Sequence, residues 1–316
     1  MNHRRRTFST ARRGYVLLVT LALLVLSSTL LVAIGRAAAH HALQAQLEQS
    51  ELQRRWGTIS CREATLPYAE QILVLTEQQE AHAAPEVRAT VQLGPDHFTL
   101  VIADEQAKAN VNLVIDQAGE QAAEDRIRQA LSGGGLGNDF RLRPAILFDD
   151  SSAPATQPAI AQLIRGPGQM FDSVTPDQLI NARPGITAPM QMLTCWGNGS
   201  LNILRANRDA MRCALGHTLS ELEISRLLAV QAGIMKPTNA SHDSTAAKPA
   251  ANTDAIGTLL ARAQIDPGKR NRLSIAVCSS CHSVWIIEQD PKRQWNSLWI
   301  SDTSNPNRVV SSSIVW

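Results

Sequence analysis

Residues 12–35 read RRGYVLLVTLALLVLSSTLLVAIG, and the rest of the chain is organised around this stretch. Residues 15–34 contain no charge, no Pro and no Gly. Because about 20 apolar residues of helix cross the hydrocarbon core of a bilayer, this run predicts a membrane-spanning helix. Five basic residues and no acidic residue precede it: Arg4, Arg5, Arg6, Arg12 and Arg13. The positive-inside rule therefore predicts a single-pass protein with a cytoplasmic N-terminus and everything after Gly35 outside.

This run differs from an ordinary cleaved secretory signal. The apolar part of such a signal has about 7 to 15 residues and ends at a small-x-small site. Here the run is longer, and it begins directly after a Gly that follows two arginines. A twin-arginine signal and an uncleaved signal anchor are the alternatives, since a basic flank before an apolar helix fits both.

The sequence Arg12-Arg13-Gly14, followed by Tyr15 and a membrane-length helix, resembles the leader of type IV pilins and type II secretion pseudopilins. In that family a prepilin peptidase cuts after the Gly, which implies a leader of residues 1–14 and cleavage between Gly14 and Tyr15. The fifth mature residue is then Val19, where most pilins have Glu. Lack of this Glu is characteristic of the K-type minor pseudopilin, the general secretion pathway protein K family.

Composition limits the functions that the exported part can have. The 316 residues leave room for about two domains beyond the anchor. The chain has 30 basic and 28 acidic residues, and residues 1–14 hold five of the basic ones and none of the acidic ones. The rest of the chain therefore has 25 basic and 28 acidic residues, a net charge of −3. This balance predicts no nucleic-acid partner.

Local patterns predict the elements that follow. Helix formers continue the first helix to about Trp56. Apolar and β-branched runs predict strands at 73–75, 89–93 and 97–105, the last two joined as a hairpin at 94–96. Helices are predicted at 117–131, 171–180 and 254–264, and a helix after Asn202 with an apolar face at Met211, Leu215, Leu219 and Leu222. A strand pair at 272–289, turning near Ser279 and Ser280, and a strand at 292–302 complete the series.

Strands that return after a helical middle indicate a helical block inserted into a sheet. The predicted class is α+β, with a transmembrane pilin-like helix and a small antiparallel β-sheet head. The resemblance implies that the inserted all-α domain is of the SAM-like or helix-hairpin-helix type. The predicted division is helix 15–57, first head part 58–116, inserted domain 117–235, low-complexity linker 236–256 and second head part 257–316.

A second stretch, residues 101–113, carries polar residues at the end of a predicted strand. It resembles the K-pseudopilin pattern Asp-Glu-x-Gly-Lys-x-Asn-Leu-Asn, although Ala107 replaces the Gly and Val111 the Leu. The matching residues are Asp104, Glu105, Lys108, Asn110 and Asn112. K pseudopilins carry a second Asn-Leu-Asn in a later stretch, and a similar stretch of this sequence keeps only Asn202 of it. Such Asn residues often bond loose backbone groups where a strand ends, and a generic polar turn is the alternative reading.

Five cysteines, an odd number, leave at least one thiol unpaired in an exported chain. Cys278 with Cys281, and Cys195 with Cys213, are candidate disulfides. Cys278, Cys281 and His282 also spell CxxCH, the signal for c-type haem attachment. The alternative function is therefore a membrane-anchored c-type haem or thiol redox protein.

No motif of a known catalytic class has the right context, and the resemblance implies a non-catalytic protein. The sequence indicates no definite cofactor. K pseudopilins bind calcium, and the resemblance makes calcium a candidate ligand. The acids that could join such a site are Asp149, Asp150, Asp172 and Asp177, with solvated loop acids as the alternative.

The resemblance implies a minor pseudopilin at the tip of a type II secretion pseudopilus, which starts assembly and supports protein export across the outer membrane. It also implies an inner-membrane location with a periplasmic C-terminal part. The implied partners are the membrane, prepilin peptidase and other minor pseudopilins.

Overall fold

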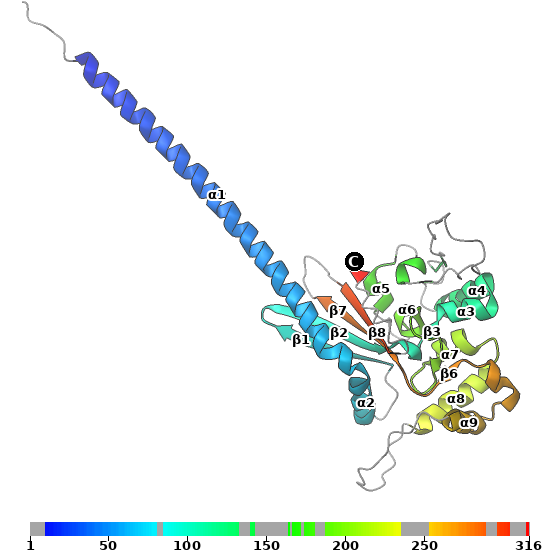
Figure 1. Ribbon diagram of the computed structural model, residues 1–316. Coiled ribbons are helices and arrows are strands. Elements are labelled where there is room, and N and C mark those ends of the chain that lie inside the picture. Colours follow the sequence, from blue (N-terminus) through cyan, green and yellow to red (C-terminus); the bar gives the residue numbers. More distant parts are fainter. Residues whose placement is uncertain are drawn as a thin grey trace, which may run out of the picture. The chain divides into compact units, whose positions relative to one another are not determined.

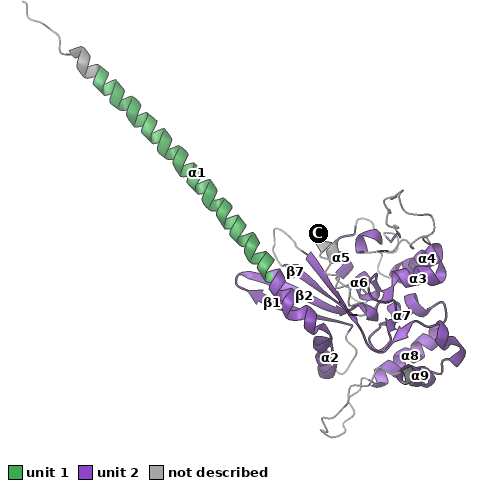
Figure 2. Ribbon diagram, in the orientation of Figure 1, with its two compact units in different colours: residues 1–57 green, residues 58–316 purple. Residues whose placement is uncertain are grey.

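A computed structural model describes residues 10–80, 85–132, 140–142, 164, 166–171, 174–180, 187–234, 253–288, 296–303 and 314–315. The chain divides into two compact units, residues 1–57 and residues 58–316 (Figure 2).

The first unit is formed by helix α1 (Thr10–Thr65) up to Gly57. Its apolar side chains between Tyr15 and Ile34 are exposed. It is the one helix in the described residues that is long and apolar enough to cross a membrane, by length and composition. The predicted N-terminal apolar helix is therefore confirmed, and it suits single-pass membrane anchoring.

Helix α1 ends later than predicted. The predicted end at about Trp56 is wrong, because the helix continues through Gly57 to Thr65. Beyond Gly57, the buried Cys61 packs in a hydrophobic cluster with residues of the sheet. Packing of this kind readily outweighs the cost of about 1 kcal/mol that a Gly imposes on a helix.

The second unit is built on a five-stranded antiparallel sheet with the order β1-β2-β7-β8-β9 (Figure 1). Its strands are β1 (Glu86–Leu93), β2 (Asp96–Asp104), β7 (Cys281–Glu288), β8 (Asn296–Asp302) and β9 (Ile314–Val315). The predicted hairpin is confirmed, since β1 pairs with β2 up to Leu93 and Asp96. Gly94 has φ 63°, which this tight turn requires. The predicted α+β class with a small antiparallel sheet is also confirmed.

The helices and the remaining short strands precede this sheet in the sequence or lie between its strands β2 and β7. Before it come η1 (Leu66–Tyr68) and α2 (Ala69–Glu80). Between β2 and β7 in the sequence lie η2 (Glu105–Ala107), β3 (Ala109–Asn110), α3 (Val111–Ala118), α4 (Glu120–Leu131), η5 (Pro167–Gln169), α5 (Pro176–Ile180), α6 (Pro189–Met192), β4 (Leu193–Thr194), β5 (Leu201–Asn202), α7 (Arg208–Leu215), α8 (Glu221–Ile234), α9 (Thr253–Arg262), η6 (Pro267–Arg272) and β6 (Ile275–Ala276).

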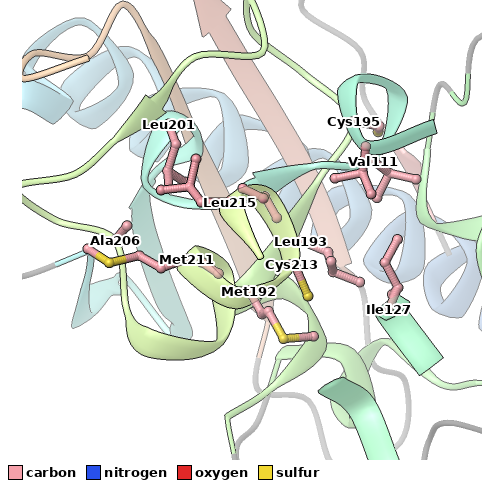
Figure 3. Packing of buried hydrophobic residues seen from close by; sticks show 14 of the residues in the cluster. Val111, Ile127, Met192, Leu193, Cys195, Leu201, Ala206, Met211, Cys213 and Leu215 are labelled. Atoms are coloured by element: carbon pink, nitrogen blue, oxygen red, sulfur yellow. The ribbon is translucent and has the colours of Figure 1, made fainter. Parts of the chain in front are cut away.

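Successive side chains of a strand point to opposite faces of the sheet. Different parts of the chain cover these two faces. One face presents Phe98, Leu100 and Ile102 of β2 to a cluster that includes Cys61 and Ala69. The opposite face contributes Val101, Trp285, Leu298 and Ile300 to the larger cluster formed with the helices between β2 and β7. Figure 3 shows part of this cluster, with Met192, Met211 and Cys213 among its residues. One face of the sheet therefore shares a core with the helices between β2 and β7, and the other face packs on a smaller cluster with α1 and α2.

Two predictions before residue 132 need correction. Residues 73–75 were predicted as a strand but lie in helix α2, where the buried Leu73 faces inward. The single helix predicted at 117–131 is two helices, α3 and α4, which meet at Gly119 with φ 80°. A residue at this φ cannot continue a right-handed helix, and glycine adopts it without strain.

Later predictions need three corrections. The strand pair at 272–289 is wrong, because β6 pairs in parallel with β5 while β7 pairs with β2 and β8. Leu222 was placed on the apolar face after Asn202 but is exposed. The linker predicted at 236–256 overlaps α9 from Thr253, and its other residues lie outside the described ones. By contrast, β8 lies within the strand predicted at 292–302, which is thereby confirmed.

Candidate functional site

The six residues of the predicted family motif meet at the junction between the sheet and the helices that follow β2. Here they lie beside residues that are distant in sequence. We call this group the polar junction; it comprises Glu70, Glu77, Asp104, Glu105, Lys108, Asn110, Asn112, Thr194, Asn202, Arg205, His282 and Ser283.

Asp104, the last residue of β2, begins the polar junction. Its Oδ1 accepts hydrogen bonds from the backbone N–H groups of Gln106 at 2.9 Å and Ala107 at 3.2 Å, which caps η2. Its Oδ2 accepts a 2.8 Å hydrogen bond from Nδ2 of Asn202. One carboxylate therefore caps a turn and also holds β5 against the end of β2.

Glu105 and Lys108 form a buried ion pair. Lys108 Nζ lies 2.6 Å from Glu105 Oε1, and the side chains are 2% and 0% exposed. The hydroxyl of Thr194 donates to Oε2 of Glu105, and the hydroxyl of Ser283 donates to Oε1. Since an unpartnered buried charge is costly, these hydrogen bonds make the carboxylate tolerable in the core.

Asn110 and Asn112 bind backbone groups of other segments. Asn110 caps α3 by accepting from Leu113 N, and it donates to the carbonyl of Trp196 at 2.9 Å. Asn112 bonds both backbone groups of Ile164, donating to its carbonyl at 2.9 Å and accepting from its N–H at 2.8 Å. Both side chains therefore satisfy backbone groups that would otherwise be buried without partners.

Arg205, which the sequence did not single out, lies at the centre of the polar junction. Its Nε donates to Glu77 at 2.7 Å and its Nη1 to Glu70 at 2.6 Å, while Nη1 also lies 3.3 Å from Asp104 Oδ2. His282 Nε2 makes a 2.9 Å contact with Glu70 Oε2. The chain offers no local signal for this group, since Arg205 is 128 residues beyond Glu77.

These contacts shift the pKa values of two groups of the polar junction, Glu70 and Arg205. Burial raises the pKa of the Glu70 carboxyl, but the hydrogen bonds from His282 and Arg205 outweigh burial and lower this pKa to about 2. Burial lowers the pKa of Arg205, yet its hydrogen bonds to Glu77 and Glu70 raise it overall. Both groups therefore stay ionised at neutral pH, and the arrangement fixes α2, β2 and β5 to one another.

The CxxCH segment does not fit a covalently attached haem. Cys278 is exposed, whereas Cys281 is buried in the core cluster that includes Trp285. Successive residues of β7 point to opposite faces, and His282 contacts Glu70 on α2. The thiols and the imidazole therefore face different surroundings, whereas haem needs them around one pocket.

The five cysteines, all within the described residues, are free thiols, so both predicted disulfides are absent from the structure. Burial raises the pKa of four thiols: Cys61, Cys195, Cys213 and Cys281. A raised pKa reduces the thiolate fraction, which disfavours redox chemistry at Cys281.

The other predicted residues lie away from the polar junction. Gly14, Tyr15 and Val19 are in α1, where Tyr15 and Val19 are exposed. Asp149, Asp150 and Asp172 lie outside the described residues, and of Asp177 only the backbone in α5 is described. Among the described residues, no group of three His, Cys, Asp or Glu is placed to hold a metal ion. Calcium binding stays a prediction.

No protein-family model, no curated protein and no solved structure matches this chain.

Proposed function

We propose that the protein is a non-catalytic K-type minor pseudopilin at the tip of a type II secretion pseudopilus, anchored in the inner membrane before assembly. One observation carries this proposal. A membrane-length apolar run, all of it within α1, follows Arg12, Arg13 and Gly14 directly, where a prepilin peptidase would cut. The N-terminus would be cytoplasmic, and the residues after Gly35 periplasmic.

The surface of the apolar helix supports the proposal. The four Ser and Thr hydroxyls between Tyr15 and Ile34 each donate to a carbonyl three residues earlier in the helix, at 2.9 to 3.0 Å: Thr20, Ser27, Ser28 and Thr29. These hydroxyls therefore need no polar partner from outside the helix, as a lipid environment demands. The same apolar surface suits packing against the helices of other pseudopilins after the helix leaves the bilayer.

Val19 supports a place at the tip. A Glu at this position would offer a carboxylate to the N-terminal amine of a subunit above, and Val19 offers none. The helices between β2 and β7 enlarge the head, and this bulk would hinder a further subunit from stacking on it. Such a subunit would start assembly and bind the other minor pseudopilins below it.

The polar junction supports the K type and a non-catalytic role. The five motif residues from Asp104 to Asn112, together with Asn202, all take part in it. Its acidic groups bind cations, hydroxyls or amides of the same chain, as expected of groups that hold a fold together.

Mass spectrometry of the intact protein from the native host tests the proposal. With active prepilin peptidase, the mature chain should begin at Tyr15, and in a peptidase-deficient strain residues 1–14 should remain. Gly14→Val should block cleavage and secretion of type II cargo. Gly35→Ala is the matched control, since no atom lies within 4 Å of a Cβ placed there, and it should be processed normally. A retained leader in the presence of peptidase, or cleavage without it, would refute the proposal.

A further inference from the structure

The turn between β4 and β5 brings an exposed amide close to a backbone nitrogen. Asn198 lies between Gly197 and Gly199, whose φ angles are 82° and 84°. Oδ1 of Asn198 accepts a 2.9 Å hydrogen bond from the backbone N–H of Ser200. This bond closes a ring that contains both Cγ of Asn198 and the backbone N of Gly199. The nitrogen is therefore held near the carbonyl carbon of the side chain.

A second donor reaches the same oxygen. Nε2 of Gln106, which is buried, donates to Oδ1 of Asn198 at 2.6 Å. If the nitrogen of Gly199 attacks Cγ, negative charge develops on Oδ1. Two fixed donors then stabilise this charge in the way that an oxyanion hole does. Gly199 has no side chain to hinder the approach.

We propose that Asn198–Gly199 is a deamidation site promoted by the fold, with Gln106 as its positioning residue. The backbone N of Gly199 bonds to Cγ, and the Cγ–Nδ2 bond breaks. The proton lost from the backbone nitrogen balances the one that Nδ2 gains as it leaves as ammonia, so the ring closes to a succinimide. Water then opens either C–N bond of the ring and yields an aspartyl or an isoaspartyl residue.

The products change a tightly packed turn. A Cβ at Gly197 would lie 3.3 Å from Cβ of Cys281, and one at Gly199 would lie 3.4 Å from Cβ of Leu113. An isoaspartyl linkage adds a carbon atom to the backbone here, so the turn must move. Oε1 of Gln106 also accepts hydrogen bonds from Ser279 and Ser280. The same amide therefore links this turn to the 279–280 segment, and the modification should loosen both as the protein ages.

Peptide mapping by mass spectrometry tests the proposal on the full-length protein in detergent at mildly alkaline pH. The rate at Asn198 is compared in the folded protein and in guanidinium chloride. Folding should speed deamidation at least about tenfold, since even one oxyanion-hole donor contributes about 10²–10³ in enzymes. Asn271, which is exposed and precedes Arg272, is the internal control and should show no such acceleration.

Gln106→Leu should slow the folded-state rate at Asn198 at least about tenfold and leave the rate in denaturant unchanged. If this variant does not fold, the comparison of deamidation rates between the folded and the unfolded wild-type protein tests the proposal. A folded protein that deamidates no faster than the unfolded chain would overturn the proposal. An unchanged deamidation rate in a folded Gln106→Leu variant would show that Gln106 does not promote the reaction.

Discussion

Nη1 of Arg205 lies 2.6 Å from Oε2 of Glu70, a residue 135 positions earlier in the chain. The Arg205 side chain is 6% exposed, and the same guanidinium reaches Glu77 and Asp104. One cation therefore pairs with three acids, two from α2 and one at the end of β2. These contacts hold the segment that carries Arg205 against α2 and the end of β2 without a disulfide.

Arg205→Met should destabilise the protein by about 3 to 5 kcal/mol, because removing one partner leaves buried carboxylates uncompensated. Urea unfolding of the detergent-solubilised protein measures the change. Arg212→Met is the matched control, since Arg212 is 42% exposed and pairs with Glu221 at the surface. The control substitution should lower the free energy of unfolding by at most about 1 kcal/mol. Equal losses in the two variants would contradict a central role for Arg205.

The stability difference between wild type and Glu70→Gln should depend on pH. The pKa of Glu70 is lowered from 4.5 to about 2, so its ionised form stabilises the fold above pH 4.5. This contribution is lost as pH falls through the folded-state pKa. The gap between the unfolding midpoints should therefore close between pH 4.5 and about 2. Glu120→Gln, a change at an exposed residue, should show no comparable trend; a gap that stays constant would argue against the ion pair.

Lys108→Met should destabilise the protein by about 3 to 5 kcal/mol, because Glu105 would keep a buried charge without its cation. The double variant Lys108→Met with Glu105→Gln should recover part of this loss, since the amide carries no charge. Its oxygen can accept a hydrogen bond from one of the hydroxyls of Thr194 and Ser283, and its NH2 group can donate to the other. A double-mutant cycle from chemical unfolding measures the coupling. Strictly additive losses would mean that the pair does not act as one unit.

One cysteine should react with a maleimide in the folded protein. Cys278 is exposed, while burial raises the pKa of Cys61, Cys195, Cys213 and Cys281. Mass spectrometry should therefore find one label per folded chain and five after unfolding in reducing conditions. Cys278→Ser should abolish the native label, whereas Cys213→Ser should keep it. Rapid native labelling of Cys281 would show that the CxxCH segment is open to solvent.

Elements with strong local signals could be predicted. The apolar run from Tyr15, the turn at Gly94 and Pro95 and the alternating residues of β8 depend on near neighbours. Residues 73–75 were assigned to a strand and lie in α2, because a short apolar run fits a strand or a buried helix equally. The end of α1 was missed because Gly57 favours a stop, while packing of Cys61 on the sheet favours continuation.

The sequence by itself determined the membrane-length helix, the α+β class and the polar residues that cluster after β2, since each depends on residues close together in the chain. Only the tertiary structure decided that β2 lies beside β7, that β6 pairs with β5, and that Arg205 joins Glu70 to Asp104. These contacts connect residues more than 70 positions apart. Their free energy arises from burial and charge neutralisation in the folded protein, so no local pattern records them.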